Sequence, residues 1–296
     1  MLYYQVAPKT MMLASCVIVL LTGLAVYFVV PKDVKVGDED THVESSMEAI
    51  KGIGYVAKLP VVWIAGLNVF CIYGTFVAAG TYFARFLQAG YGTSAVAAAV
   101  FASIVIGLRM LPLVSSILVE KVFESTAHFM RTLQIILVIL LSAIAFIFFT
   151  NHPDIALYSQ GYLPDQAPEG LISSGMFTLL MVLMLCASAC CFMIRGVYYA
   201  PIGELGVAKK HSSAAMSFAI TLGYLPALLA PIILGGLVQS PEKDAAGHII
   251  RSYLTDTHVL AMAFVGLAVL ALVAVCMSHM LVKLRAKLIK ENKIEG

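Results

Sequence analysis

The amino-acid sequence predicts an all-α membrane protein with seven transmembrane helices. Three observations lead to this fold class. Hydrophobic residues make up 60% of the 296 positions and charged residues only 12%, whereas soluble domains are about 25% charged. The apolar residues form stretches of the length that crosses a hydrocarbon core, which is about 20 residues. Lysine and arginine are concentrated in every second connection between these stretches.

Seven stretches have the length and hydropathy of a transmembrane helix. They cover residues 11–30, 59–84, 94–119, 132–150, 171–194, 212–239 and 258–282. The first stretch has the position of a signal peptide. Its long apolar run and the sequence Pro31-Lys32-Asp33 that follows argue against cleavage, so we predict that it is a membrane helix.

The connections between the spans predict the orientation of the chain. One alternate set of segments holds fourteen Lys and Arg residues and the other holds four, and Arg109, inside a span, completes the nineteen. Because positive charge accumulates on the cytoplasmic side, we expect the N-terminus outside and the C-terminus in the cytoplasm. Residues 31–58 are then a charged cytoplasmic linker, and residues 151–170 an outer loop with several Pro and Gly residues.

Polar side chains are distributed unevenly among the spans. The first, fourth and seventh spans are almost entirely apolar, whereas the other four carry polar residues, in most cases along one helical face. In the second span that face holds Asn68, Thr75 and Tyr82, and in the sixth it includes Tyr224. This period of three predicts two three-helix repeats whose inner helices line a site near the middle of the bilayer. The alternative is that small polar residues only help the helices to pack.

Arg109 is the one formally charged residue deep inside a span. Its burial in lipid costs about 2.5–3.5 kcal/mol on insertion scales, so it requires a watery cavity, an anion or an ion pair. The seven spans contain no deeply placed Asp or Glu to pair with it. We predict that Arg109 faces a solute-binding cavity, with snorkelling or structural pairing as the alternative.

Three segments resemble parts of the major facilitator superfamily. Residues 116–121, Ser-Ile-Leu-Val-Glu-Lys, resemble its loop pattern G-x-L-x-D-R/K, with Ser116 in place of Gly and Glu120 in place of Asp. Residues 201–216 are similar to the acidic-then-basic connection between the tenth and eleventh helices of that family. Residues 195–201, Arg-Gly-Val-Tyr-Tyr-Ala-Pro, look like its bacterial sugar-phosphate and organic-anion branches.

The resemblance covers essentially the whole chain and implies its domain organisation. Residues 59–284 would be the C-terminal six-helix bundle, and residues 1–30 the leftover equivalent of helix six. Residues 31–58 would link the two halves, and residues 285–296 would be a basic cytoplasmic tail. The bacterial inner membrane, which is the plasma membrane, is the implied location.

The resemblance also implies roles for individual residues. Arg109, Asn68, Thr75, Tyr82 and Tyr224 would face the solute. Glu120 and Lys121 would form one gating loop, and Glu204 with Lys209 or Lys210 its counterpart. For these loop residues, ordinary solvated charge at the membrane surface is the alternative.

The implied function is secondary transport of a small solute by alternating access, with an anion favoured by Arg109. A facilitator works by one six-helix bundle moving against another, so the chain would be a fragment, pair with a separate N-terminal half, or pair with a second copy. We therefore expect no uptake by the purified chain alone.

Two other interpretations remain open at this stage. The chain could be one subunit of a split transporter. It could also be a seven-helix receptor or sensor, although the D-R-Y and N-P-x-x-Y motifs are absent. The expected partners are a small solute and the lipid bilayer, not nucleic acid. No cofactor, metal site or catalytic constellation is expected, so an enzyme is disfavoured.

Overall fold

The computed structural model describes residues 8–29, 52–123, 125–163, 166, 168–208 and 211–291. It divides into two units, Met1–Ser46 and Met47–Gly296. The first unit contains one described helix, α1 (Pro8–Val29), where the sequence predicts a helix over residues 11–30. The second unit holds every other described element and contains the candidate site.

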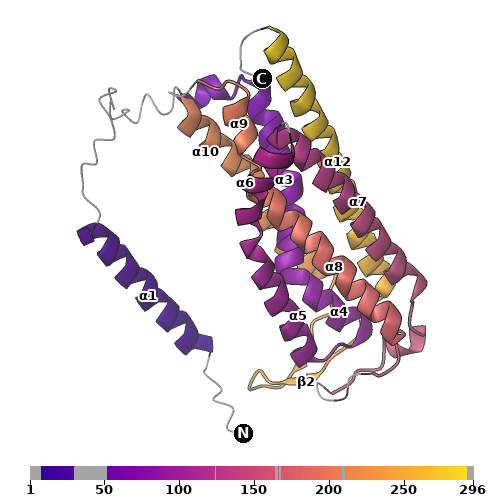
Figure 1. Cartoon of the computed structure of the whole chain (residues 1–296). Helices are drawn as coiled ribbons and strands as arrows, with labels where there is room; N and C mark the ends of the chain where they lie inside the picture. The colour runs from indigo at the N-terminus through magenta and orange to yellow at the C-terminus, as the bar shows by residue number, and fades with distance from the viewer. Residues whose placement is uncertain are drawn as a thin grey trace. The chain divides into compact units, whose positions relative to one another are not determined.

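The second unit is built almost entirely from helices (Figure 1). Its all-α class is as predicted, apart from one two-stranded hairpin. After a helical turn at residues 52–56, the elements are α3 (Pro60–Val77), the π-helix η1 (Ala78–Tyr82), α4 (Phe83–Tyr91), α5 (Ala95–Gly107), the 3₁₀ turn η2 (Leu108–Met110), α6 (Pro112–Val122), α7 (Thr126–Thr150), the 3₁₀ turn η3 (Ile155–Leu157), α8 (Ser174–Arg195), α9 (Ala200–Glu204), α10 (Ser212–Gly223), α11 (Leu225–Gly236), β1 (Glu242–Lys243), β2 (Ile249–Arg251) and α12 (Thr257–Lys290).

Among the described residues, five helical runs are long and apolar enough to cross a membrane. They are Pro60–Tyr91, Thr126–Thr150, Ser174–Glu204, Ser212–Gly236 and Thr257–Lys290. A sixth span results when Ala95–Met110 and Pro112–Val122, which are bent by 44°, count as one. These six correspond to the six spans predicted after residue 58. In α1 the apolar stretch is the shorter Leu13–Ala25, so the predicted count of seven is not confirmed.

Two of the spans are broken where proline enters them. Pro112 lacks a backbone N–H and its ring crowds the carbonyl of Leu108 four residues earlier, so α5 ends in the η2 turn and α6 starts in a new direction. Pro226 lies in the first turn of α11, and Tyr224 forms the break between α10 and α11. The helix axis bends by 44° at Pro112, as is usual where a proline enters a helix.

The core of the unit lies where α12 packs along α7 and α3. Phe264 of α12 contacts Phe83 and Phe86 at ring distances of 5.3 and 5.7 Å, and it stacks on Phe148 at 5.3 Å. All four rings are fully buried. Because lipid is as apolar as these side chains, close packing rather than exclusion of water holds such helices together.

The connections separate into two groups at opposite ends of the unit. At one end, Tyr162 of the loop after α7 pairs with Ser252 beside β2, and the Thr255 N–H donates to the Ala89 carbonyl at 2.7 Å. At the other end, Tyr55 lies 4.5 Å from the ring of His211. The first group contains segments predicted to lie outside and the second contains predicted cytoplasmic segments, in agreement with the predicted alternation.

Parts of two predicted segments are described by the structure. Helix α12 continues to Lys290, so residues 285–290, the first half of the predicted basic tail, are helical. Leu, Ala, Lys and Arg favour helix in this stretch, and Lys287 and Lys290 lie in the last turn, where cations stabilise a helix. Of the predicted linker, residues 31–51 lie outside the described residues. Val56 near its end is fully buried against the bundle.

Candidate functional site

Two arginine side chains lie over one aromatic ring on the second unit. The guanidinium carbon of Arg195 is 4.3 Å from the ring centre of Phe76, and that of Arg109 is 6.0 Å from it. Phe76 belongs to α3, Arg109 to the η2 turn and Arg195 to the last turn of α8. Both arginines are exposed, whereas Phe76 is buried beneath them. A positively charged surface with an apolar floor results.

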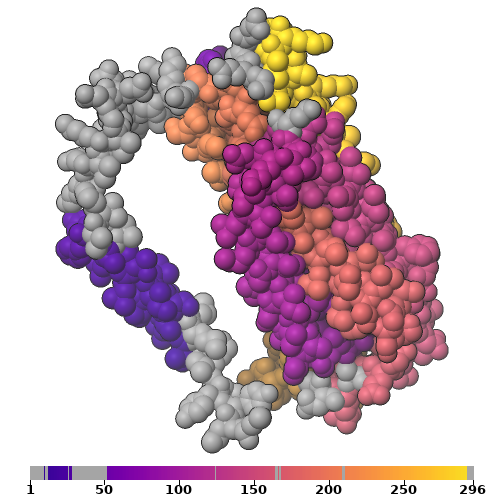
Figure 2. Space-filling view, in the orientation of Figure 1, coloured from indigo at the N-terminus to yellow at the C-terminus, as the bar shows by residue number. Residues whose placement is uncertain are grey.

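The packing of α6 against α8 brings the two arginines together. Gly196 follows Arg195, and a Cβ at Gly196 would lie 3.0 Å from the Cα of Pro112. Only glycine allows this approach of the two chain segments. The Ser115 hydroxyl then donates to the Met193 carbonyl at 2.8 Å, which fixes the contact. Helices α5, α6 and α8 form part of one face of the unit (Figure 2).

A π-helical segment lies directly beneath Arg109. In η1 the chain takes a wider turn, and a Cβ at Gly80 would lie 3.3 Å from Nη2 of Arg109. Short π-helical segments inside α-helices are frequent at functional sites, because they re-aim side chains without ending the helix. The absence of a side chain at Gly80 leaves room for the guanidinium group.

Tyrosine rings extend this surface toward the break between α10 and α11. Tyr73 stacks on Phe76 at 5.3 Å and on Tyr224 at 4.3 Å. The Tyr224 hydroxyl lies 3.4 Å from that of Tyr198, and the buried Tyr199 hydroxyl has no hydrogen-bond partner among the described residues. We name Tyr73, Phe76, Arg109, Arg195, Tyr198 and Tyr224 the arginine–aromatic cluster.

The cluster carries positive charge that the described residues do not neutralise. Within the described ranges, neither Arg109 nor Arg195 forms an ion pair with a carboxylate. Stacking over Phe76 contributes about 0.5–1 kcal/mol at an exposed site, which is far less than an anion in a dry site would contribute. The arrangement can therefore bind an anion through two guanidinium groups and use the tyrosine hydroxyls as further donors.

Two of the five predicted solute-binding residues belong to this cluster, namely Arg109 and Tyr224. Thr75 is adjacent to Phe76 in sequence, but it is fully buried and its hydroxyl bonds back to the Cys71 carbonyl at 3.5 Å. Tyr82 is also buried, with its hydroxyl 3.7 Å from where a Cβ at Gly235 would lie. Both therefore support the neighbouring helices rather than line the exposed surface.

Asn68, the remaining predicted residue, lies in a different polar group. Its amide nitrogen donates to the Ser278 hydroxyl at 2.7 Å and to the Ala274 carbonyl at 3.2 Å. Its amide oxygen accepts from Gln134 at 3.0 Å. Asn68, Gln134 and Ser278 are fully buried, and we name them the asparagine network. The network joins α3, α7 and α12, so Asn68 packs helices together and does not face the arginine–aromatic cluster.

Three of the predicted gating residues, Glu120, Lys121 and Glu204, are described and lie at the end of the unit that contains Tyr55 and His211. Glu204 accepts a hydrogen bond from the Thr126 hydroxyl, which ties α9 to the first turn of α7. Glu120 and Lys121 are exposed near the end of α6. Lys209 and Lys210 lie outside the described residues, so their pairing with Glu204 stays a prediction.

Sequence reasoning missed four members of the cluster, which are Tyr73, Phe76, Arg195 and Tyr198. Arg195 was assigned to a cytoplasmic connection because it ends a span. The one available signal was the segment of residues 195–201, which suggested anion-transporting branches by resemblance.

Among the described residues, one group of metal-ligating side chains is also close enough to hold an ion, and it consists of His152, Asp256 and His258.

Comparison with known proteins identifies no relative of this chain. No family model matches the chain, and no curated protein matches its sequence. The resemblance to the major facilitator superfamily therefore rests on the residues quoted above.

Proposed function

We propose that this chain is the C-terminal six-helix bundle of a major facilitator-type secondary transporter, with α1 as one further span, and that it binds a small anion. The observation that carries the proposal is the placement of Arg109 and Arg195 over Phe76 without a carboxylate partner among the described residues. The proposal includes a bacterial inner-membrane location with the N-terminus outside.

The chemistry of the cluster favours carboxylate or phosphate groups. A guanidinium group is planar, carries five N–H donors and binds such anions through two parallel hydrogen bonds. Away from bulk water these charge-assisted bonds are stronger, because the local dielectric constant is lower. Tyr198 and Tyr224 add hydroxyl groups, and the rings of Tyr73 and Phe76 suit an organic portion of the anion.

The breaks in the helices supply the mobility that transport requires. The η2 turn carries Arg109, and Tyr224 forms the break between α10 and α11. In transporters, interrupted helices commonly form the substrate site, and their ends absorb the rearrangement between states. Alternating access would then come from movement of this bundle against a second half or a second copy of the chain.

Binding by the intact chain in lipid nanodiscs tests the proposal. Isothermal titration would use inorganic phosphate, glucose 6-phosphate and malate as probes. We expect saturable binding of at least one probe, weakened about 10- to 100-fold by Arg109→Ala and by Arg195→Ala, because a hydrogen bond to a charged group contributes about 1.5–3 kcal/mol.

Arg85→Ala is the matched control. Arg85 also lies over an aromatic ring, that of Tyr82, at 5.9 Å, but it is outside the cluster. Its removal should leave binding unchanged. If no probe binds, or if Arg85→Ala weakens binding as much as Arg109→Ala does, the cluster is not an anion site and the proposal is wrong.

A further inference from the structure

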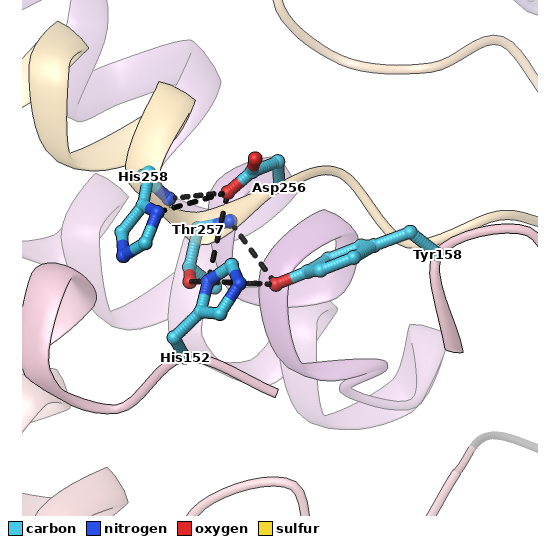
Figure 3. Close-up of polar contacts among 5 residues, drawn as sticks. All are labelled: His152, Tyr158, Asp256, Thr257 and His258. Atoms are coloured by element: carbon cyan, nitrogen blue, oxygen red, sulfur yellow. Dashed lines mark hydrogen bonds and ion pairs between the residues drawn. The ribbon is translucent and has the colours of Figure 1, made fainter. Parts of the chain in front are cut away.

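A group of metal-ligating side chains joins the segment after α7 to the start of α12. Asp256 is the N-cap of α12, His258 lies in the first turn, and His152 follows α7 (Figure 3). One ligand atom from each residue lies within 4.8 Å of the other two. We name these three residues the histidine cluster. It belongs to the end of the unit that carries the β1–β2 hairpin, so it is separate from the arginine–aromatic cluster.

The distances within the histidine cluster approach those of a metal site. Oδ1 of Asp256 is 3.6 Å from Nδ1 of His152 and 3.9 Å from Nδ1 of His258. Two ligands of a tetrahedral zinc ion, each about 2.1 Å from the metal, lie about 3.4 Å apart. A shift of a few tenths of an ångström would bring Asp256 to ligand distance from each histidine, and the two imidazole nitrogens, which lie within 4.8 Å of one another, must approach further.

Neighbouring hydroxyl groups complete the arrangement. The Thr257 N–H donates to the Tyr158 oxygen at 3.4 Å, which leaves the phenol proton free to donate to Nδ1 of His152 at 3.2 Å. The Thr257 hydroxyl also lies 3.0 Å from this Nδ1, and a metal ion would take the place of both hydroxyl protons on the single lone pair of the nitrogen. The hydroxyl oxygens of Thr257 and Tyr158, 3.0 and 3.2 Å from Nδ1, are the two nearest candidates for a fourth ligand.

An ion can reach the histidine cluster from solvent. The side chains of Asp256 and His258 are 46% and 44% exposed, and that of His152 is 22% exposed. The two imidazole rings stack in parallel at 4.0 Å. Parallel rings cannot both aim their in-plane lone pairs at one ion, so binding requires them to rotate about χ2, a torsion with a broad energy well.

We propose that His152, Asp256 and His258 bind one divalent transition-metal ion of the Zn²⁺ type. Two imidazole nitrogens and one carboxylate oxygen form a donor set that such ions prefer over Mg²⁺ and Ca²⁺. The bound ion ties the end of α7 to the N-terminus of α12. The metal site is independent of the proposed transport function, and the sequence alone does not predict it.

Metal titration of the whole chain in detergent micelles tests the proposal. ZnCl₂ binding is followed by calorimetry, and CoCl₂ binding by the visible absorption of the coordinated ion. We expect one saturable site per chain. His152→Ala and His258→Ala should each weaken Zn²⁺ binding at least tenfold, because each removes one of three protein ligands.

Two further variants guard against misfolding and unspecific binding. Asp256→Asn keeps a side chain that can cap α12 and removes the charged ligand, so it should fold and still bind Zn²⁺ at least tenfold more weakly. His248→Ala is the matched control, because His248 pairs with Asp244 at 3.1 Å in an exposed turn without a second histidine. The proposal is overturned if the wild-type chain shows no single saturable site. It is also overturned if Asp256→Asn leaves Zn²⁺ binding unchanged, or if His248→Ala weakens Zn²⁺ binding as much as the cluster variants do.

Discussion

The asparagine network and the arginine–aromatic cluster both include residues of α3, but they differ in burial and in hydrogen bonding. Asn68 is fully buried and uses its amide oxygen and nitrogen within the unit. Arg109 and Arg195 are exposed and pair with no carboxylate among the described residues. In the first group Asn68 is satisfied within the unit, although Oε1 of Gln134 has no partner among the described residues, whereas in the second group neither arginine has an anionic partner there. Satisfied polar groups hold helices together, whereas unsatisfied charge requires a ligand.

The largest expected effect on folding comes from breaking the asparagine network. Asn68→Ala leaves the Gln134 amide nitrogen without its acceptor in a buried site. We expect a loss of about 1–3 kcal/mol of stability, the usual cost of an unsatisfied buried group. Unfolding in mixed detergent measures it. Anion binding by the folded fraction should be unchanged, and a selective loss of anion binding at full stability would reverse the roles assigned to the two groups.

A smaller effect is expected when the charge of the cluster is kept and its shape is changed. Arg195→Lys retains the positive charge but loses the planar group that lies 4.3 Å over Phe76. We expect anion binding to weaken about three- to tenfold, because an ammonium group cannot form the paired hydrogen bonds of a guanidinium. Calorimetry in nanodiscs gives the ratio. If Arg195→Lys binds the anion as tightly as the wild-type chain, the positive charge at this position is sufficient and the planar guanidinium group is not needed.

The smallest effect is expected from the π-helical segment. A methyl group in Gly80→Ala would lie 3.3 Å from Arg109 Nη2 and would displace it by a few tenths of an ångström. We expect anion binding to weaken about two- to threefold, with stability kept or slightly raised since alanine favours helix by about 1 kcal/mol over glycine. Titration and thermal unfolding of the same sample test both parts. An unaltered affinity would show that Arg109 does not need its present position.

Most of the fold could be predicted from the sequence, because hydropathy determines where helices cross a membrane. The six spans after residue 58 begin within six residues of their predicted starts and end within ten residues of their predicted ends. The π-helix of residues 78–82 could not be predicted, since its wider turn depends on the packing around Gly80 and Arg109. The sequence analysis assigned no secondary structure to the basic tail, and the structure continues α12 into it as far as Lys290.

The candidate site was predicted only in part, for physical reasons that differ between residues. Arg109 stands out because a charge in an apolar run is costly. Phe76 does not stand out, since an aromatic residue in such a run can face lipid equally well. Helical spacing placed Asn68 on the face of Thr75 and Tyr82, but spacing does not reveal which neighbouring helix covers that face. The histidine cluster joins His152 to Asp256 and His258, which lie far along the chain from it, so the short Asp-Thr-His sequence could not indicate the cluster by itself.

The central claim is that Arg109 and Arg195 act on the same bound anion. A double-mutant cycle with Arg109→Ala, Arg195→Ala and the double variant tests it most directly, with calorimetry of the tightest-binding probe in nanodiscs. We expect the double variant to lose at least about 1 kcal/mol less than the two single losses combined, as residues that share a ligand do. Losses that add to within about 0.3–0.5 kcal/mol would show that the two arginines act independently and would contradict the claim.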